Sequence, residues 1–195
     1  KPLAAWAPSF KSRMVNFVPP DGYVAMNPSI TRLGDDLIVN LRTVNYVLNS
    51  SGQYLIRSTG TEATDDNPID TRNFLMRINR DMTQGSFPAE ITWDRPAPQF
   101  KPVTGLEDIR LFSIDNRLHF SACVREQNAG GWCEQVTGWL SHADNDKWSI
   151  GGWSVMRPPC RLHEKNWMPW GRNHDVQFVY RLGTIVDSNA KPIST

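Results

Sequence analysis

Turn-forming residues divide this sequence into segments that are too short for long helices. Proline, glycine or Asn/Asp pairs interrupt nearly every window of about 12 residues, so no apolar stripe with helical spacing is sustained. The interruptions leave short runs rich in β-branched and aromatic residues, which is typical of strands. These runs are residues 37–42, 53–57, 73–78, 110–114, 118–124, 135–140, 153–156 and 176–180. The sequence therefore predicts an all-β protein.

Hairpin signals lie between the predicted strands. They are Gly34-Asp35-Asp36, the segment 49–52, Asp115-Asn116 and Asn173-His174-Asp175. Asn, Asp and Gly accept the positive φ angles that tight hairpin turns require. Neighbouring strands are therefore expected to pair antiparallel.

A weak internal repeat refines the predicted fold. Residues 27–39 can be laid over residues 107–120 and 164–178, and each copy has a polar cluster, a short strand, a turn and an apolar strand. The copies begin 81 and 57 residues apart, counting from Asn27 to Asp108 (108 − 27) and from Asp108 to Lys165 (165 − 108). Variable spacing of this kind suits β-propeller blades, although three similar hairpins in a β-sandwich are the alternative.

We predict a β-propeller of the five-bladed type, with three to four blades in this chain. Residues 1–195 are then a single propeller domain or a piece of one, because closed propellers typically need about four to eight blades. Further sequence or a homo-oligomer would supply the missing blades. In a propeller the innermost strands surround one channel, so polar clusters that open these strands meet at one mouth.

Composition narrows the classes of partner. Lys and Arg number 21 against 20 Asp and Glu, and this balance gives no broad positive field for nucleic acid. No apolar run is long enough for membrane insertion. The three cysteines, Cys123, Cys133 and Cys160, form an odd set without metal-ligand spacing. We expect a cytoplasmic protein with no metal and no organic cofactor.

The densest polar cluster is Gly105-Leu106-Glu107-Asp108-Ile109-Arg110, where two carboxylates and a guanidinium open an apolar strand. Strand alternation places Asp108 and Arg110 on one face and Glu107 on the other. A cation beside Asp108 would lower its pKa and burial would raise it, so the sequence leaves the net direction open. A structural ion pair at a turn is the alternative reading.

A second cluster, residues 161–170, contains His163, Lys165, Asn166 and Trp167. The ammonium of Lys165 suits phosphate or sugar hydroxyls, and the Trp167 ring suits the apolar face of a pyranose. Asn27, Arg42 and Arg125 occupy corresponding positions near the ends of other predicted strands. Alternatively, each of these residues has no functional role and lies in a solvated loop or at an exposed strand end.

The clusters resemble motifs of glycoside hydrolase family 130, the five-bladed propellers of the β-mannoside phosphorylase and β-mannosidase group. Residues 105–110 are similar to the family pattern Gly-x-Glu-Asp-Pro-Arg, with Ile109 in place of the proline. Arg125, the segment 164–166 and Asn27-Pro28 add to the resemblance. The Glu-Lys-Asn-Trp-Met-Pro string at 164–169 also resembles a propeller-like domain found beside bacterial surface-polysaccharide glycosyltransferases.

The resemblance implies roles for individual residues. Asp108 matches the general acid, and Arg125, Lys165 and His163 match groups that hold inorganic phosphate as a co-substrate. The remaining candidates for substrate binding are Asn27, Arg42, Glu107, Arg110, Asn166 and Trp167. An acid on one side of the bond and an anion site on the other is the arrangement of an inverting reaction.

Three functions therefore follow as hypotheses. The first is inverting phosphorolysis or hydrolysis of β-mannoside-type glycosidic bonds in an oligosaccharide or polysaccharide. The second is a non-catalytic glycan-binding or scaffolding propeller in cell-surface polysaccharide assembly. The third is a propeller whose mouth binds a peptide or protein.

Overall fold

The computed structural model describes residues 5, 7, 9, 12–143, 147–156, 163–172 and 174–194. Within these residues the regular structure is strand, with no α-helix. The all-β prediction is confirmed. Two residues named above, Cys160 and Asn173, lie outside the described residues.

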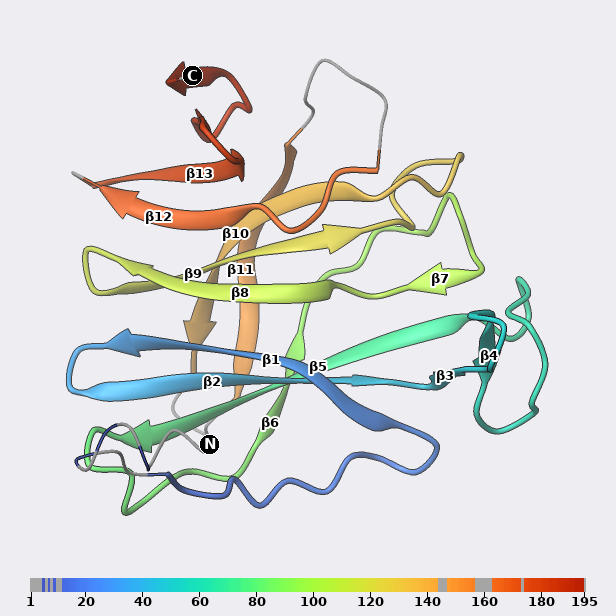
Figure 1. Cartoon of the computed structure of the whole chain (residues 1–195), viewed down its shortest axis with the longest axis horizontal. Coiled ribbons are helices and arrows are strands. Elements are labelled where there is room, and N and C mark those ends of the chain that lie inside the picture. Colours follow the sequence, from blue (N-terminus) through green and yellow to red (C-terminus); the bar gives the residue numbers. More distant parts are fainter. Residues whose placement is uncertain are drawn as a thin grey trace.

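Twelve strands form three antiparallel units of four strands each, which we call blades 1, 2 and 3 (Figure 1). Blade 1 contains β1 (Val24–Leu33), β2 (Asp36–Val44), β5 (Ile69–Asn79) and β6 (Ala89–Thr92). Blade 2 contains β8 (Glu107–Ile114), β9 (Arg117–Val124), β10 (Glu134–His142) and β11 (Trp148–Met156). Blade 3 contains β12 (Met168–Arg172), β13 (Asp175–Arg181), β14 (Thr184–Val186) and β15 (Pro192–Ser194).

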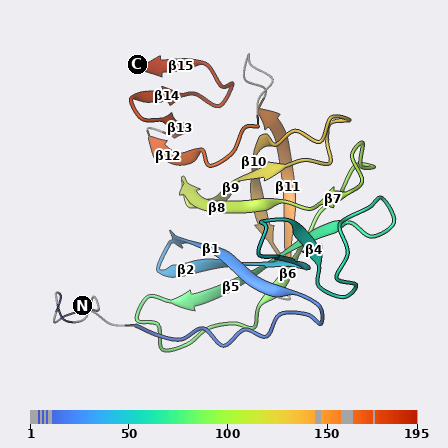
Figure 2. The same cartoon turned by 45° about the vertical axis from the view of Figure 1, so that its right-hand side comes forward.

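Short strands complete the structure around these blades. The pair β3 (Tyr46–Leu48) and β4 (Tyr54–Ile56) forms a separate hairpin, and β7 (Val103–Thr104) pairs in parallel with β5. β6 also pairs in parallel with β11, so blades 1 and 2 share one continuous sheet (Figure 2). This pairing holds the two blades at a fixed angle.

The first strands of the three blades lie side by side. β8 packs between β1 and β12, and their arrowheads in Figure 1 point to the same side. The backbone N–H of Leu111 in β8 donates to Oγ of Ser29 in β1 at 3.4 Å, which links two of these strands directly. The starts of all three strands therefore meet at one end of the molecule, as the repeat predicted.

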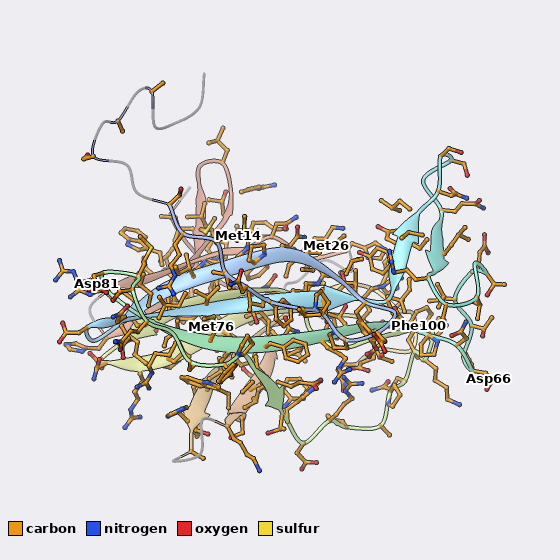
Figure 3. All side chains as sticks on the ribbon, turned by 90° about the horizontal axis from the view of Figure 1, so that it is seen from below. Met14, Met26, Asp66, Met76, Asp81 and Phe100 are labelled. Carbon is orange, nitrogen blue, oxygen red and sulfur yellow. The ribbon has the colours of Figure 1, made fainter. Side chains whose placement is uncertain are left out.

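The hairpins follow from their turn residues. Asp115 and Asn116 between β8 and β9 have φ angles of 50° and 58°, which is the left-handed pair of a type I′ turn. Gly34 between β1 and β2 has a φ of 59°. Asp81, at the β5–β6 turn, and Phe100, in the segment before β7, mark opposite ends of the strands in Figure 3.

The main core lies between blades 1 and 2. Ile38 and Leu75 of blade 1 pack against Ile109, Phe120 and Val136 of blade 2, and all five are almost completely buried. Burial of each such side chain contributes about 1.5–3 kcal/mol to folding. A smaller core lies between blade 3 and the end of β11 in blade 2, and it is made by Met156, Trp167, Phe178, Val186 and Ala190.

Gly105 controls how the chain enters β8. Its φ is 92°, and a Cβ placed there would lie 2.2 Å from the backbone oxygen of Thr71 in β5. Any side chain would therefore push β8 away from blade 1. Position 105, just before Glu107 and Asp108, therefore has to be a glycine if β8 is to approach β5 this closely.

The Gly105→Ala variant is expected to lose about 2–4 kcal/mol of unfolding free energy, because it combines a left-handed backbone with a backbone clash. Gly183→Ala is the matched control, since Gly183 has a similar φ of 82° but no atom within 4 Å of the added Cβ. The control should lose about 1 kcal/mol. Urea denaturation measures both, and equal losses would contradict the close approach of β8 to β5.

Candidate functional site

Three polar residues in left-handed backbone conformation lie at or near the starts of the inner strands of the three blades. Asn27, Asp108 and Asn166 have φ angles of 44°, 51° and 66°. Non-glycine residues hold this conformation only where the surrounding structure enforces it, at a cost of about 1–3 kcal/mol each. Asn and Asp accept it more readily than other residues. The same strained residue type thus recurs at the same place in each blade.

These three residues line one hollow of about 300 Å³ at the meeting point of the inner strands. The rest of its wall is made by Pro28, Ser29, Ile109 and Arg110. Arg110 Nη2 donates to the side-chain oxygen of Asn166 at 3.3 Å, so blades 2 and 3 are joined at the rim. The hollow is therefore built from segments that are far apart in the sequence.

Arg42 lies beside the hollow and binds both carboxylates of β8. It comes from β2 and is only 2% exposed. Its Nη1 donates to Oδ1 of Asp108, and its Nη2 lies 3.7 Å from Oε2 of Glu107. Asn27 Nδ2 donates to the same Asp108 oxygen at 2.8 Å. Asp108 is therefore held by two groups of blade 1.

A β-bulge explains why Glu107 and Asp108 reach the same cation. The pairing of β8 with β9 shifts register between Glu107 and Arg110, and β1 shifts register between Met26 and Ser29. Strict alternation predicted that Asp108 and Arg110 share one face and that Glu107 lies on the other. Asp108 and Arg110 do line the same hollow and Glu107 does not, although both carboxylates lie within reach of Arg42. The left-handed φ of Asp108 turns the chain so that both carboxylates approach Arg42.

The two carboxylates occupy different environments. Burial raises the pKa of Glu107, and the positive charge of Arg42 opposes that rise only in part. Asp108 lines the hollow, whereas Glu107 does not. Asp108 is thus the carboxylate that a bound molecule would contact, and Glu107 lies behind it.

Arg125 and His163 lie around a buried pair of thiols next to Glu107. Arg125 Nε donates to the backbone oxygen of Gly131 at 2.8 Å, and its guanidinium lies 5.5 Å from the Phe100 ring centroid. Nδ1 of His163 accepts a hydrogen bond from the backbone N–H of Cys133 at 3.1 Å. The charge of Arg125 also acts on Glu107 and lowers its pKa slightly.

Cys123 and Cys133 were not predicted as part of this region. Both are buried and unoxidised, and Cys123 pairs in register with Glu107. A hydrogen bond from Cys123 lowers the pKa of Cys133, and His163 and Arg125 add to that effect against burial. The adjacency of β8, β9 and β10 brings these residues together, and the sequence spacing gave no signal of it.

Two residues of the second predicted cluster do not reach the hollow. Lys165 is exposed, and no hydrogen bond or ion pair joins it to another described residue. Trp167 is 1% exposed, and its Nε1 donates to Oε2 of Glu164 at 3.1 Å. Its ring packs in the core of blade 3 against Phe178 and Tyr180. The prediction that Trp167 offers its face to a sugar does not fit this burial.

The third copy of the repeat is displaced by one residue from its predicted register. The sequence alignment matched Lys165 with Asn27 and Asp108. The backbone conformation instead matches Asn166 with them, because Asn166 shares their left-handed φ and their hollow. Asn166 is therefore the residue of blade 3 that belongs to the site.

Within the described ranges, no group of three or more His, Cys, Asp or Glu residues is placed to hold a metal ion. No helix in the same part of the chain is long and apolar enough to cross a membrane.

Comparison with solved structures identifies the fold. A family 117 glycoside hydrolase, Zg3597 from the marine bacterium Zobellia galactanivorans, superposes with a TM-score of 0.54 at 12% identity. The match covers 94% of this chain and 59% of that protein. The chain has a β-propeller fold. The prediction of a propeller is confirmed, and the chain spans less than two thirds of the length of this relative.

Two further structures are similar at lower scores. The β-1,2-mannobiose phosphorylase from Listeria innocua gives a TM-score of 0.45 at 11% identity, over 90% of this chain and 60% of that one. The Hadza microbial sialidase Hz136 gives 0.48 at 12% identity, over 90% and 33%. No protein-family model and no curated protein sequence matches the chain.

The environment of Glu107 predicts how stability depends on pH. Because its folded pKa is raised, Glu107 contributes stability that is complete below its unfolded pKa of about 4.3 and is lost as pH rises through the folded pKa. The Glu107→Gln variant lacks this pH-dependent contribution to stability. The unfolding free energy of the wild type relative to Glu107→Gln should therefore fall between pH 4 and pH 7.

Guanidinium denaturation of both proteins across this range measures the difference. A difference that grows with pH would mean that Arg42 stabilises the Glu107 carboxylate more than burial destabilises it.

Proposed function

We propose that this chain is the carbohydrate-active part of a propeller that cleaves β-mannoside-type bonds with inversion, by phosphorolysis or hydrolysis. One observation carries the proposal: three strained polar residues from three blades surround a single hollow that contains the Asp108 carboxylate. The fold supports the proposal, since the chain superposes on a family 117 glycoside hydrolase. The motif resemblance at residues 105–110 supplies the sugar and the type of bond.

Asp108 is the proposed general acid. It is the carboxylate on the wall of the hollow, and its position is set by Arg42 and Asn27. A sugar that fills the hollow would displace water from around this carboxyl group. Positioned acids of this kind contribute about 10²- to 10⁴-fold in rate.

The amide and guanidinium groups of the rim are proposed to bind sugar hydroxyls. Asn27, Arg110 and Asn166 line the hollow and offer both donors and acceptors. Pro28 and Ile109 provide apolar surface on the same wall. This mixture of polar and apolar groups suits one face of a pyranose ring.

Inorganic phosphate is the proposed co-substrate of the phosphorolytic reaction. His163 accepts a hydrogen bond from the backbone N–H of Cys133, the charge of Arg125 acts on Glu107, and Lys165 directly precedes Asn166. Arg125, His163 and Lys165 are the groups that the motif resemblance assigns to phosphate. Phosphate would attack the anomeric carbon from the face opposite Asp108, so the anomeric configuration inverts.

Product release from a panel of β-mannosides tests the proposal. With phosphate the expected product is a sugar 1-phosphate, and without phosphate it is the free sugar. Asp108→Asn should reduce the rate by about 10²-fold or more. Asp66→Asn is the matched control, because Asp66 is exposed and lies in the loop between β4 and β5 (Figure 3), and it should keep full activity. Full activity of Asp108→Asn would reject the assigned role.

A second candidate is a propeller that binds glycans without cleaving them. It is favoured by the contacts of Arg42 and Asn27 with Asp108, since both donate to this carboxylate and both stabilise its charged form. Glycan binding without product release, at an affinity that phosphate does not change, would support this candidate over the enzyme.

A further inference from the structure

A second pocket lies between blades 1 and 2, and the proposed reaction does not use it. It has a volume of about 220 Å³. Its walls come from β5, β6, the segment after β6, the start of β8 and β11. The lining residues are Asp70, Thr71, Arg72, Asn73, Glu90, Ile91, Trp93, Arg95, Leu106, Ile109 and Ile150. Ile109 also lines the hollow at Asp108, so the two spaces lie on either side of the start of β8.

The charged residues that line this pocket are two cations, Arg72 and Arg95, and two carboxylates, Asp70 and Glu90, so their formal charges sum to zero. Nε of Arg72 donates to Oε1 of Glu90 at 2.8 Å, and Nη2 of Arg72 binds the other oxygen of that carboxylate. Arg95 Nε lies 3.6 Å from Oε1 of the buried Glu126. Asp70 accepts hydrogen bonds from the hydroxyls of Tyr23 and Thr104. Because the charges are already matched, the pocket favours a neutral polar molecule over an ion.

The lining also includes apolar groups and an indole. Ile91, Leu106 and Ile150 contribute aliphatic surface. Trp93 is partly buried, packs edge-on against Trp153 at 5.6 Å and lies under the Arg95 guanidinium at 5.2 Å. A lining that mixes charged and apolar groups suits a sugar ring, which has hydroxyls at its edge and C–H groups on its face.

Thr71 supplies an independent sign of a ligand. Its side chain is 3% exposed and forms part of the pocket wall. Its Oγ1 is buried and has no hydrogen-bond partner in the described part of the chain. A buried hydroxyl left without a partner costs about 1–3 kcal/mol. A hydroxyl of a bound molecule would give it the missing partner.

We propose that this pocket is a second sugar-binding site, which takes one neutral monosaccharide unit independently of the hollow at Asp108. The small volume, below the roughly 300 Å³ of typical drug-sized sites, limits the ligand to one ring. The common wall at Ile109 makes the two sites neighbours, so consecutive parts of one glycan can occupy both.

The Thr71→Val variant separates this proposal from a purely structural role of Thr71. Valine keeps the shape and removes the unpartnered hydroxyl, so the unfolding free energy should stay the same or rise. Sugar binding should weaken by about tenfold, which corresponds to the loss of one hydrogen bond worth about 1.4 kcal/mol. If Thr71 only packed in the core, Thr71→Val would not weaken sugar binding while leaving the unfolding free energy unchanged or higher.

Binding is measured by NMR titration with mannose, glucose and galactose, in the Asp108→Asn background so that no turnover occurs. Trp93→Ala should also weaken binding by tenfold or more, and Trp139→Ala, which removes a half-exposed indole that lines neither pocket, should leave it unchanged. Chemical shift changes should appear at residues 71–73 and 90–95.

Three results would overturn the proposal: no binding of any of these sugars, equal affinity in Thr71→Val, or shift changes confined to Asn27, Asp108 and Asn166. None of them depends on catalysis, because binding is measured in the Asp108→Asn background, in which the proposed acid is absent. Loss of the second site and loss of the proposed reaction are therefore distinguishable.

Discussion

The contact of Arg42 with Asp108 joins blade 1 to blade 2 at the point where the inner strands meet. Arg42 is almost completely buried, and an isolated guanidinium in that position would be costly. Asp108 and Glu107 supply the compensating charge, and they are the first two residues of β8. The buried Arg42 guanidinium therefore depends on the β8 bulge, because the bulge lets both carboxylates reach it. The two carboxylates in turn depend on Arg42 for a partner of opposite charge. This mutual dependence fixes the geometry of the hollow.

The same region concentrates backbone strain. Asn27, Asp108 and Asn166 all hold left-handed conformations, and Gly105 allows β8 to approach Thr71 closely. A stable protein keeps such conformations where the surrounding packing is strong, and here the core around Phe120 and Ile109 lies directly below. Strained backbone held by a rigid core keeps the polar groups of a site in fixed positions. Such groups do not have to reorganise when a ligand binds.

Much of the fold could be predicted from the sequence because alternation and turn chemistry are local signals. The runs that become β2, β5, β8, β9 and β10 were all recognised, and Asp115-Asn116 forms the expected hairpin. The polar clusters at Asn27 and Asp108 were also correctly placed at the starts of inner strands. A periodic pattern does not reveal a bulge, however, so the approach of both Glu107 and Asp108 to Arg42 could not be predicted from it.

Long-range packing explains the other differences. Trp167 and Trp170 lie three residues apart and look alike in the sequence, yet one is 1% exposed and the other 44%. Only the hydrogen bond to Glu164 and the rings of blade 3 decide which of them is core. Likewise, 66 residues separate Arg42 from Asp108, and no local pattern identifies them as partners. The pocket beside Thr71 depends on two blades meeting, so it has no signature in either blade alone.

A double-mutant cycle on Arg42 and Asp108 tests the central interaction most directly. The unfolding free energies of Arg42→Met, Asp108→Asn and the double variant are compared with that of the wild type at pH 7. Because the two side chains are in contact across the blade boundary, we expect a coupling free energy of about 1 kcal/mol or more. Additivity within about 0.3 kcal/mol would contradict the account, since it would mean that blades 1 and 2 are not joined through this pair.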